Sequence, residues 1–508
     1  MLFNSYEFLF LFLPATLAVF FVLSGTRQQR LAAAWLAIAS IVFYGYWSPR
    51  YVFLLLISIG ANFSAGRMIM AHRAAERMEA AKRVLVVAIV ANLAALAWFK
   101  YANFFVDSVN AVASTGLTLP KIILPIGISF FTFTQIAFLV DTYSGKVREP
   151  GIVPYTLFVT FFPHLIAGPV LHHAEMMPQF ARESTYRFNL ETFRIGAIYF
   201  AIGLFKKVVL ADGIQPYVAP VFDSDPAQPL TALEAWGGVL AYTLQLYFDF
   251  SGYSDMAIGL SKLLNVDLPL NFDSPYKATN ISEFWRRWHM TLSRFLRDYL
   301  YVPLGGNRLG TSRRYANLMT TMLLGGLWHG AGWTFVIWGG LHGLYLVVHQ
   351  LWQRVRPPAE KPSALGRGAA VLCTFLCVVI AWVFFRATSL DSALRVLEGM
   401  AGVNGLVLPI EWRDLLLGVL ASAGVDATFR PLDAFGGLLQ LAWIGGLLAV
   451  VWASPNSQEI VASIRARAAA MRREHWAWMT LGGVATAVFM LAAINGSRGS
   501  SEFIYFNF

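Results

Sequence analysis

Residues 247–259 read YFDFSGYSDMAIG and place two carboxylates, Asp249 and Asp255, among aromatic, small and apolar side chains. Two further stretches have the same character: residues 284–289 read FWRRWH, and residues 327–335 read LWHGAGWTF. An ionisable group in hydrocarbon is costly, so such groups within apolar sequence are candidates for function. The three stretches therefore indicate a membrane protein with chemically active groups in its interior.

Composition sets the class of the whole chain. Of the 508 residues, 57% are hydrophobic and 13% are charged, whereas a soluble domain carries about 25% charged residues. Apolar runs long enough to cross a bilayer as a helix lie at residues 6–24, 31–47, 51–66, 84–105, 122–143, 155–170, 192–211, 231–260, 317–337, 338–353, 368–386, 435–453 and 477–494. The sequence predicts an all-α polytopic membrane protein with roughly eleven to thirteen spans, some runs being interfacial or re-entrant.

The charge distribution agrees with a membrane protein. The net charge is +10, and the cationic residues cluster in short loops at 27–30, 67–83, 146–148, 354–367 and 465–473. With the N-terminus outside, the first three clusters lie in the cytoplasm, as positively charged loops do. Such loops suit anionic lipid head groups, so we expect membrane lipids as partners and no nucleic acid. Residues 66–83 are expected to form a short amphipathic cytoplasmic helix.

No internal repeat or long linker divides the chain, so a single domain is predicted over residues 1–508. Two apolar stretches, 163–173 and 325–335, contain prolines or glycines around a histidine. Irregular backbone at membrane depth is tolerated only where protein or water covers it. Both stretches therefore point to an internal cavity.

His289 belongs to a predicted amphipathic helix over residues 281–301. At 100° per residue, its aromatic and leucine side chains gather on one side and its arginines on the other, which is typical of a helix in the membrane interface. His289 falls within the apolar arc, between Trp285 and Leu292. It is either a site residue or a core histidine bonded to a backbone carbonyl.

His329 lies in a long uncharged stretch, between Trp328 and Gly330. The neighbouring glycines would let a ligand or another backbone approach closely. Because desolvation disfavours a charged imidazole, we expect a neutral ring that can accept a proton as a general base. The alternative is helix–helix packing through small residues, with an incidental histidine.

The remaining polar residues suggest less. Asp249 and Asp255 could orient a histidine or relay protons, or they could pair within the bundle with Arg386 or Lys206; Asp255 is the better candidate for a site neighbour. No zinc-ligand spacing, Walker A loop or GxSxG elbow occurs, so we expect no metal and no tightly bound cofactor. His342 and His349 lie seven residues apart without facing partners that would suit haem.

Five motifs together closely resemble the membrane-bound O-acyltransferase family, and in particular its bacterial exopolysaccharide O-acetylation branch. The resemblance is dense over residues 95–345. The motifs are LPIGISFFTF (124–133), FFPHLIAGPVL (161–171), QLYFDFSGYSDMAIG (245–259), EFWRRWHMTLSRFLRDYLYVPLGGN (283–307) and LGGLWHGAGWTFVIWG (324–339).

The resemblance implies a ring of helices around a transmembrane tunnel, with a catalytic role for His329. His289 corresponds to the family's second motif residue. The expected donor is a cytoplasmic thioester, acetyl-CoA, used as a substrate; its phosphates would meet arginines at the cytoplasmic face. The candidate supporting residues are Asp255, Asp249, Trp328 and Asn271, and the candidate phosphate contacts are Arg286, Arg287 and Arg294.

The implied activity is O-acetylation of an exopolysaccharide such as alginate or cellulose. It would take place at a bacterial inner membrane, either directly or through periplasmic partner acetyltransferases. Three alternatives stay open. The chain could transfer D-alanyl or another acyl group to a cell-envelope polymer. It could be a transporter or flippase, which would also show buried carboxylates and broken helices, or a non-catalytic scaffold of a secretion complex.

Overall fold

The computed structural model describes residues 1–26, 28–147, 151–166, 168–225, 227–356, 363–405, 407–425, 427–470, 483 and 502–504. The chain forms two compact units. The first unit combines Met1–Leu204, Gly252–Asn271 and the described residues from Ser457 onward; the second combines Phe205–Ser251 with Phe272–Asn456. Helix α11 (Ala232–Leu263) contributes its first part to the second unit and its last part to the first.

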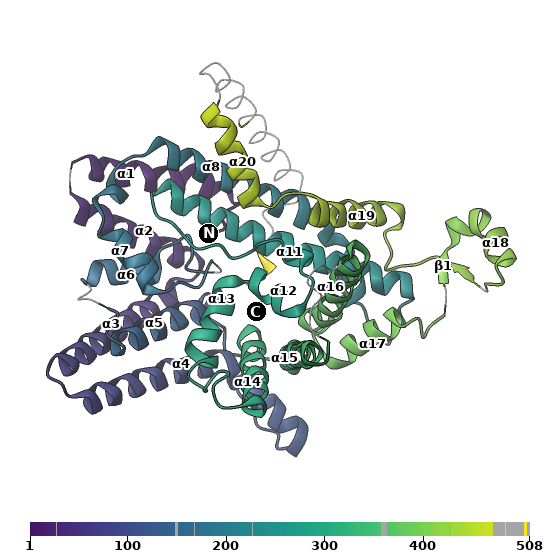
Figure 1. The fold of residues 1–508 in the computed structure, drawn as a ribbon, viewed down its shortest axis with the longest axis horizontal. Coiled ribbons are helices and arrows are strands. Elements are labelled where there is room, and N and C mark those ends of the chain that lie inside the picture. Colours follow the sequence, from purple (N-terminus) through teal and green to yellow (C-terminus); the bar gives the residue numbers. More distant parts are fainter. Residues whose placement is uncertain are drawn as a thin grey trace. The chain divides into compact units, whose positions relative to one another are not determined.

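The first unit is helical. Besides the end of α11, its elements are η1 (Glu7–Phe12), α1 (Leu13–Gly25), α2 (Gln29–Trp47), α3 (Pro49–Ala74), α4 (Met78–Ala113), α5 (Ile128–Tyr143), α6 (Ile152–Thr160), α7 (His173–Phe180), η2 (Glu183–Tyr186), α8 (Leu190–Phe205, of which Phe205 belongs to the second unit) and α20 (Ser457–Ala470). Helices α3, α4 and α5 pack against one another (Figure 1). Asn62 of α3 and Asn92 of α4 exchange amide hydrogen bonds of 3.1 and 2.7 Å, which satisfies two buried polar groups.

Glycines bring the end of α11 close to α8. A Cβ on Gly259 would lie 2.6 Å from the carbonyl oxygen of Gly196, and a Cβ on Gly203 would lie 2.5 Å from that of Gly252. Close contact through small residues is a common way for membrane helices to pack. The glycines within the YFDFSGYSDMAIG stretch therefore bring two helix backbones together.

The second unit carries the remaining elements. Besides the start of α11, these are η3 (Lys206–Ala211), α9 (Asp212–Ile214), η4 (Gln215–Tyr217), α10 (Ala219–Phe222), η5 (Pro275–Lys277), α12 (Ile281–Arg287), α13 (Met290–Leu296), η6 (Arg297–Tyr301), α14 (Thr311–His329), α15 (Trp333–Val355), α16 (Ala364–Arg386), α17 (Leu390–Met400), β1 (Val407–Pro409), η7 (Ile410–Trp412), α18 (Arg413–Ser422), β2 (Thr428–Arg430) and α19 (Gly437–Ala453). Strands β1 and β2 pair in parallel, with Val407 opposite Thr428. Helices α14 and α15 run along each other, and α16 packs on α15.

Among the described residues, five helices are long and apolar enough to cross a membrane, or six if a bent pair forms one span. They comprise η1 with α1, α2, α3, α4 and α16, and the bent pair is α19 with α20. The all-α polytopic class is confirmed. The number of eleven to thirteen spans and the central tunnel stay predictions, and most of the run at 477–494 lies outside the described residues.

Three expected boundaries differ. Residues 66–83 form no separate amphipathic helix, because α3 continues to Ala74 and α4 begins at Met78. The run at 122–143 becomes helical only at Ile128, after Gly127 takes a left-handed conformation with φ 71°. The run at 155–170 stops being helical after Thr160, so the irregular backbone predicted near Pro163 is present.

Candidate functional site

His329 is the last residue of α14 in the second unit. The helix stops there because Gly330 is extended, with φ −155° and ψ 149°, and α15 begins three residues later at Trp333. The break between the apolar runs predicted at 317–337 and 338–353 therefore lies at 330–332. The backbone of His329 is therefore held by helix α14 on its N-terminal side. On its C-terminal side the chain continues into the short non-helical link at 330–332.

Glycines set the distance between α14 and α15. A Cβ on Gly326 would lie 2.3 Å from the carbonyl oxygen of Phe335, and a Cβ on Gly339 would lie 2.3 Å from that of Met322. A side chain at either position would push the helices apart. The glycines around His329 thus serve helix packing, which was one of the two alternatives for this stretch, and that packing also positions the histidine.

Aromatic rings surround His329, which is 4% exposed. Its ring centroid lies 4.9 Å from Trp328, 4.9 Å from Trp338 of α15 and 5.2 Å from Phe385 of α16. All three rings meet the imidazole edge to face. The surroundings are therefore dry and apolar, which strengthens any electrostatic interaction with a reacting group.

His289 breaks the helix that was predicted over 281–301, so that prediction is wrong in this respect. Helix α12 ends at Arg287, α13 begins at Met290, and His289 between them is left-handed with φ 42° and ψ 52°. A left-handed non-glycine residue is uncommon, although histidine is one of the residue types that adopt this conformation more often. The break turns the His289 ring fully into the interior, where its exposure is 0%.

Burial has a clear effect on His289. His289 lies between the short helices α12 and α13, which are outside the candidate spans. Desolvation by burial lowers the pKa of His289 to about 3. The ring is therefore neutral at pH 7. A neutral imidazole has one N–H donor and one nitrogen acceptor, so it can orient a hydroxyl or donate to a carbonyl oxygen.

The two histidines lie in one cluster. Their ring centroids are 6.5 Å apart, and the His289 ring also lies 6.4 Å from Trp328 and 4.8 Å from Phe250 of α11. The structure thus brings together three of the predicted site residues: His329 and Trp328 at the end of α14, and His289 between α12 and α13. Two imidazoles at this spacing can act on a small polar group between or beside them.

The three candidate arginines differ in surroundings. Arg286 is exposed and Arg294 is partly exposed, whereas Arg287 binds Glu283 at 2.8 Å. Partial burial raises the pKa of Glu283, but hydrogen bonds from Thr279 and Arg287 outweigh it and hold that pKa below its usual value. An ionised Glu283 competes with any outside phosphate for Arg287, so Arg287 is a weaker candidate for a donor contact than the exposed Arg286.

Asp249 forms a buried ion pair with Lys207, a residue that was not suggested from the sequence. The Lys207 Nζ lies 2.8 Å from Asp249 and 2.8 Å from Asp212, and these three side chains are almost completely buried. Arg386 instead binds Asp223 at 2.7 Å. The expected pairing of Asp249 within the bundle is thus present, with Lys207 as a partner. Asp249 precedes Phe250, which packs on His289, so the pair anchors the part of α11 behind that ring.

Asp255 and Asn271 belong to the first unit. Asp255 accepts a hydrogen bond from the Ser457 hydroxyl, and the Asn271 amide donates to the Ser254 hydroxyl at 3.2 Å. Both side chains are buried. Their proposed roles beside the histidines stay predictions.

Sequence reasoning did not single out several neighbours of His329. Trp338 lies between His329 and His342, since its ring is 4.8 Å from that of His342. His342 is fully buried, and its Nδ1 accepts a hydrogen bond from the Trp285 indole at 3.3 Å. The available signal was the spacing of four residues between Trp338 and His342, which places both on one face of a helix. Phe385 gave no signal, because its contact depends on how α16 packs.

Comparison with known proteins gives the chain its family. The family model described as "MBOAT, membrane-bound O-acyltransferase family" matches residues 86–390. The chain is 43% identical to the peptidoglycan O-acetyltransferase of Helicobacter pylori, over 80% of this chain and 81% of that protein. It is 45% identical to the probable alginate O-acetylase AlgI of Pseudomonas aeruginosa, over 79% of this chain and 75% of that protein.

A teichoic acid D-alanyltransferase of Streptococcus thermophilus is more distant, with 27% identity over 46% of this chain and 59% of that protein. The acetyl-transferring relatives thus match more of the chain at higher identity. The matched region contains both histidines and the aromatic rings around them, as well as the ion pair of Lys207 with Asp249. The chain is an acyltransferase and belongs to the membrane-bound O-acyltransferase family.

Proposed function

We propose that this chain transfers acetyl groups from a cytoplasmic thioester to hydroxyl groups of a cell-envelope or extracellular polysaccharide, with His329 as the general base. The observation that carries the proposal is the pair of buried histidines, His329 and His289, inside an aromatic cluster within the family's matched region. Acetyl-CoA is the expected donor, bound as a substrate. The expected location is a bacterial inner membrane.

The chemistry follows from the surroundings of the two rings. His329 takes the proton from an acceptor hydroxyl, whose oxygen forms the new bond to the thioester carbonyl carbon. The carbon–sulfur bond then breaks, and the departing thiolate takes up a proton, so that an ester and a free thiol are formed. The neutral His289 orients the acceptor or donates to the carbonyl oxygen as charge develops there.

Exposed arginines on α12 and α13 would attract the donor phosphates. Arg286 and Arg294 are at least partly exposed, and both lie within three to five residues of His289 along the chain. Charge-assisted contacts between guanidinium and phosphate are among the stronger polar interactions. These arginines therefore link the cytoplasmic donor to the histidine cluster.

The acceptor is a polysaccharide hydroxyl or a partner that passes the acetyl group on. The relatives are named for alginate and for peptidoglycan, which supports a glycan as the final acceptor. Periplasmic acetyltransferases are the expected partners, with alginate, cellulose or peptidoglycan as the modified polymer. Transfer of D-alanyl groups is the second candidate, supported by the more distant relative.

The decisive experiment replaces His329. A positioned base contributes about 10²- to 10⁴-fold to the reaction rate. His329→Ala should therefore abolish acetylation of the secreted or envelope polymer, while the amount of the variant protein in the membrane stays normal. Mass spectrometry of the isolated polymer counts the acetyl groups. His349→Ala, which removes a histidine from α15 outside the cluster, is the matched control and should keep acetylation.

Retained acetylation in the His329→Ala cells would reject the assignment. A transporter or a scaffold would also tolerate this substitution, provided that the complex assembled. Normal acetyl content in those cells, together with loss of polymer when the whole chain is deleted, would favour one of these non-catalytic functions.

A further inference from the structure

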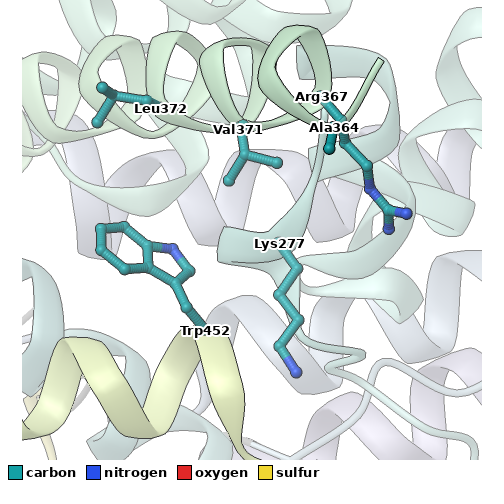
Figure 2. A pocket seen from close by; sticks show the side chains of 7 residues that line it. Lys277, Ala364, Arg367, Val371, Leu372 and Trp452 are labelled. Atoms are coloured by element: carbon teal, nitrogen blue, oxygen red, sulfur yellow. The ribbon is translucent and has the colours of Figure 1, made fainter. Parts of the chain in front are cut away.

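A cavity of about 530 Å³ in the second unit lies between the start of α16, η5 and the end of α19. The lining residues are Lys277, Ala364, Arg367, Gly368, Val371, Leu372 and Trp452. Figure 2 shows Lys277 and Arg367 toward one end of this space and Leu372 and Trp452 toward the other. Nothing in the acyl-transfer chemistry above uses these residues, so their arrangement needs its own explanation.

One end of the cavity is positively charged. Its seven lining residues include two cations and no carboxylate. Lys277 is half-buried and its Nζ donates to the carbonyl oxygen of Ser454 at 2.8 Å, which holds the ammonium in place. Arg367 is exposed on the first turn of α16. A hydrogen-bonded lysine and an exposed arginine at one end favour a phosphate or a similar anion.

The other end is apolar and is formed by helices long and apolar enough to lie in a membrane. Helix α16 is one of the candidate spans and α19 belongs to the bent pair. Leu372 is 50% exposed and Trp452 is 38% exposed, so the wall formed by these side chains opens to the surroundings. Tryptophan is enriched at the membrane interface, where its ring contacts lipid acyl chains and its N–H lies among polar groups. A soluble anion would leave this wall without a partner.

We propose that the cavity binds one anionic phospholipid of the surrounding bilayer. Lys277 and Arg367 hold the phosphate, and an acyl chain lies along Val371, Leu372 and Trp452. The volume falls within the usual range for small-molecule sites, roughly 300–1,000 Å³. Arg367 also belongs to the basic cluster at 354–367, and basic segments beside membrane helices are typical binding sites for anionic lipids.

Two substitutions test the two halves of the site. Arg367→Gln removes a charge from an exposed side chain, and Arg356→Gln, an exposed arginine of the same basic segment outside the lining, is its control. Gly368→Trp fills the cavity, because a Cβ on Gly368 meets nothing within 4 Å. Gly60→Trp on α3 is the matched control, since Gly60 is exposed on another span and is equally open.

Native mass spectrometry of the purified full-length protein in detergent provides the measurement. Phosphatidylglycerol and phosphatidylcholine with the same acyl chains are added in competition. The unaltered protein should retain one phosphatidylglycerol preferentially. Arg367→Gln should reduce this preference about fivefold, as expected for one cation near a membrane surface. Gly368→Trp should lose the bound lipid, and both controls should behave as the unaltered protein.

The proposal is overturned if Arg367→Gln keeps the full preference for the anionic lipid, or if Gly368→Trp still retains it. Equal competition by glycerol phosphate, which has the head group without the chains, would reassign the cavity to a soluble anion and also overturn the lipid proposal. Lys277→Gln could loosen the contact with Ser454, so the Lys277→Arg protein, which keeps the charge, should keep the preference. None of these results depends on acyl-transfer activity.

Discussion

His289 illustrates what a single residue can determine. The sequence predicts a regular helix with His289 on its apolar arc, because residues 281–301 contain neither proline nor glycine. The structure buries the ring but does so through a left-handed residue between two short helices. Such a conformation costs on the order of 1 kcal/mol, and only tertiary contacts can offset that cost. Burial of His289 was therefore predictable and the break was not.

The low pKa of His289 predicts how stability depends on pH. The pKa is lowered to about 3 in the folded protein, against 6.5 for the ordinary side chain. Below pH 6.5 the unfolded chain binds a proton that the folded chain does not, so stability is highest above that pH. It should fall as the pH drops toward 3, by up to about 1.4 kcal/mol per pH unit.

The measurement is the thermal unfolding midpoint of the purified protein between pH 7.5 and pH 4.5. His289→Asn cannot take up this proton, so its midpoint should fall less steeply with acid than that of the unaltered protein. His329, the titratable ring 6.5 Å away, is present in both proteins and cancels in the comparison. Parallel curves would show that His289 does not stay neutral in the folded protein.

The ion pair of Asp249 could be predicted from the sequence only in part. Its burial and its need for a cation could be predicted, since a buried carboxylate requires a partner. The identity of the partner could not be predicted, because Lys206 and Lys207 are adjacent and the turn that holds them is π-helical. A π-helical turn changes which of two neighbouring side chains faces inward, and hydropathy does not reveal it.

At the scale of elements, long apolar helices were predictable and short ones were not. The runs at 31–47 and 435–453 lie within two residues of α2 and α19. The run at 155–170 is helical only to Thr160, and Pro163 marks in the sequence the irregular backbone that follows. A limit applies to the site: the histidines lie on predicted elements, but the rings from α15 and α16 join them only through helix packing.

Packing of α14 on α15 should be sensitive to a single methyl group. Gly326→Ala places a Cβ 2.3 Å from the carbonyl oxygen of Phe335, so the helices must separate and His329 must move. Overpacking of this kind costs roughly 1–3 kcal/mol. We expect a lower unfolding midpoint and reduced polymer acetylation.

Gly340→Ala on α15, the helix that packs against α14, is the matched control. Its Cβ would lie 3.5 Å from a Leu323 methyl group, which is ordinary contact, and alanine favours the helix over glycine by up to about 1 kcal/mol. The midpoint should stay the same or rise. Equal loss of stability in both variants would show that helix separation at Gly326 is not the cause.

The distribution of basic residues predicts how the whole molecule is oriented in its membrane. The basic segment 67–83 includes the turn between α3 and α4, and the positive-inside rule assigns it to the cytoplasm. The next loop, 114–127, follows α4 and should lie on the opposite face. The multi-pass character is established by the family and the apolar helices, but the direction rests on charge alone.

Cysteine labelling tests that orientation. After Cys373 and Cys377 are replaced by alanine, single cysteines are introduced as Ala75→Cys and Thr115→Cys, both at exposed positions. A membrane-impermeant maleimide added to spheroplasts should label the cysteine at 115 at once, and the cysteine at 75 only after the membrane is opened. The reverse pattern would invert the proposed direction of acetyl transfer.

The sharing of α11 between the two units has a consequence for synthesis. The first unit takes in Gly252–Asn271 and Ser457 onward, whereas the second occupies most of the chain between them. The ribosome therefore releases every segment of the second unit's main body before Ser457 emerges to bind Asp255. The first unit therefore stays incomplete in the bilayer until helix α20 is synthesised. Frameshifts upstream of Ser457 should leave an incompletely folded first unit that quality-control proteases degrade.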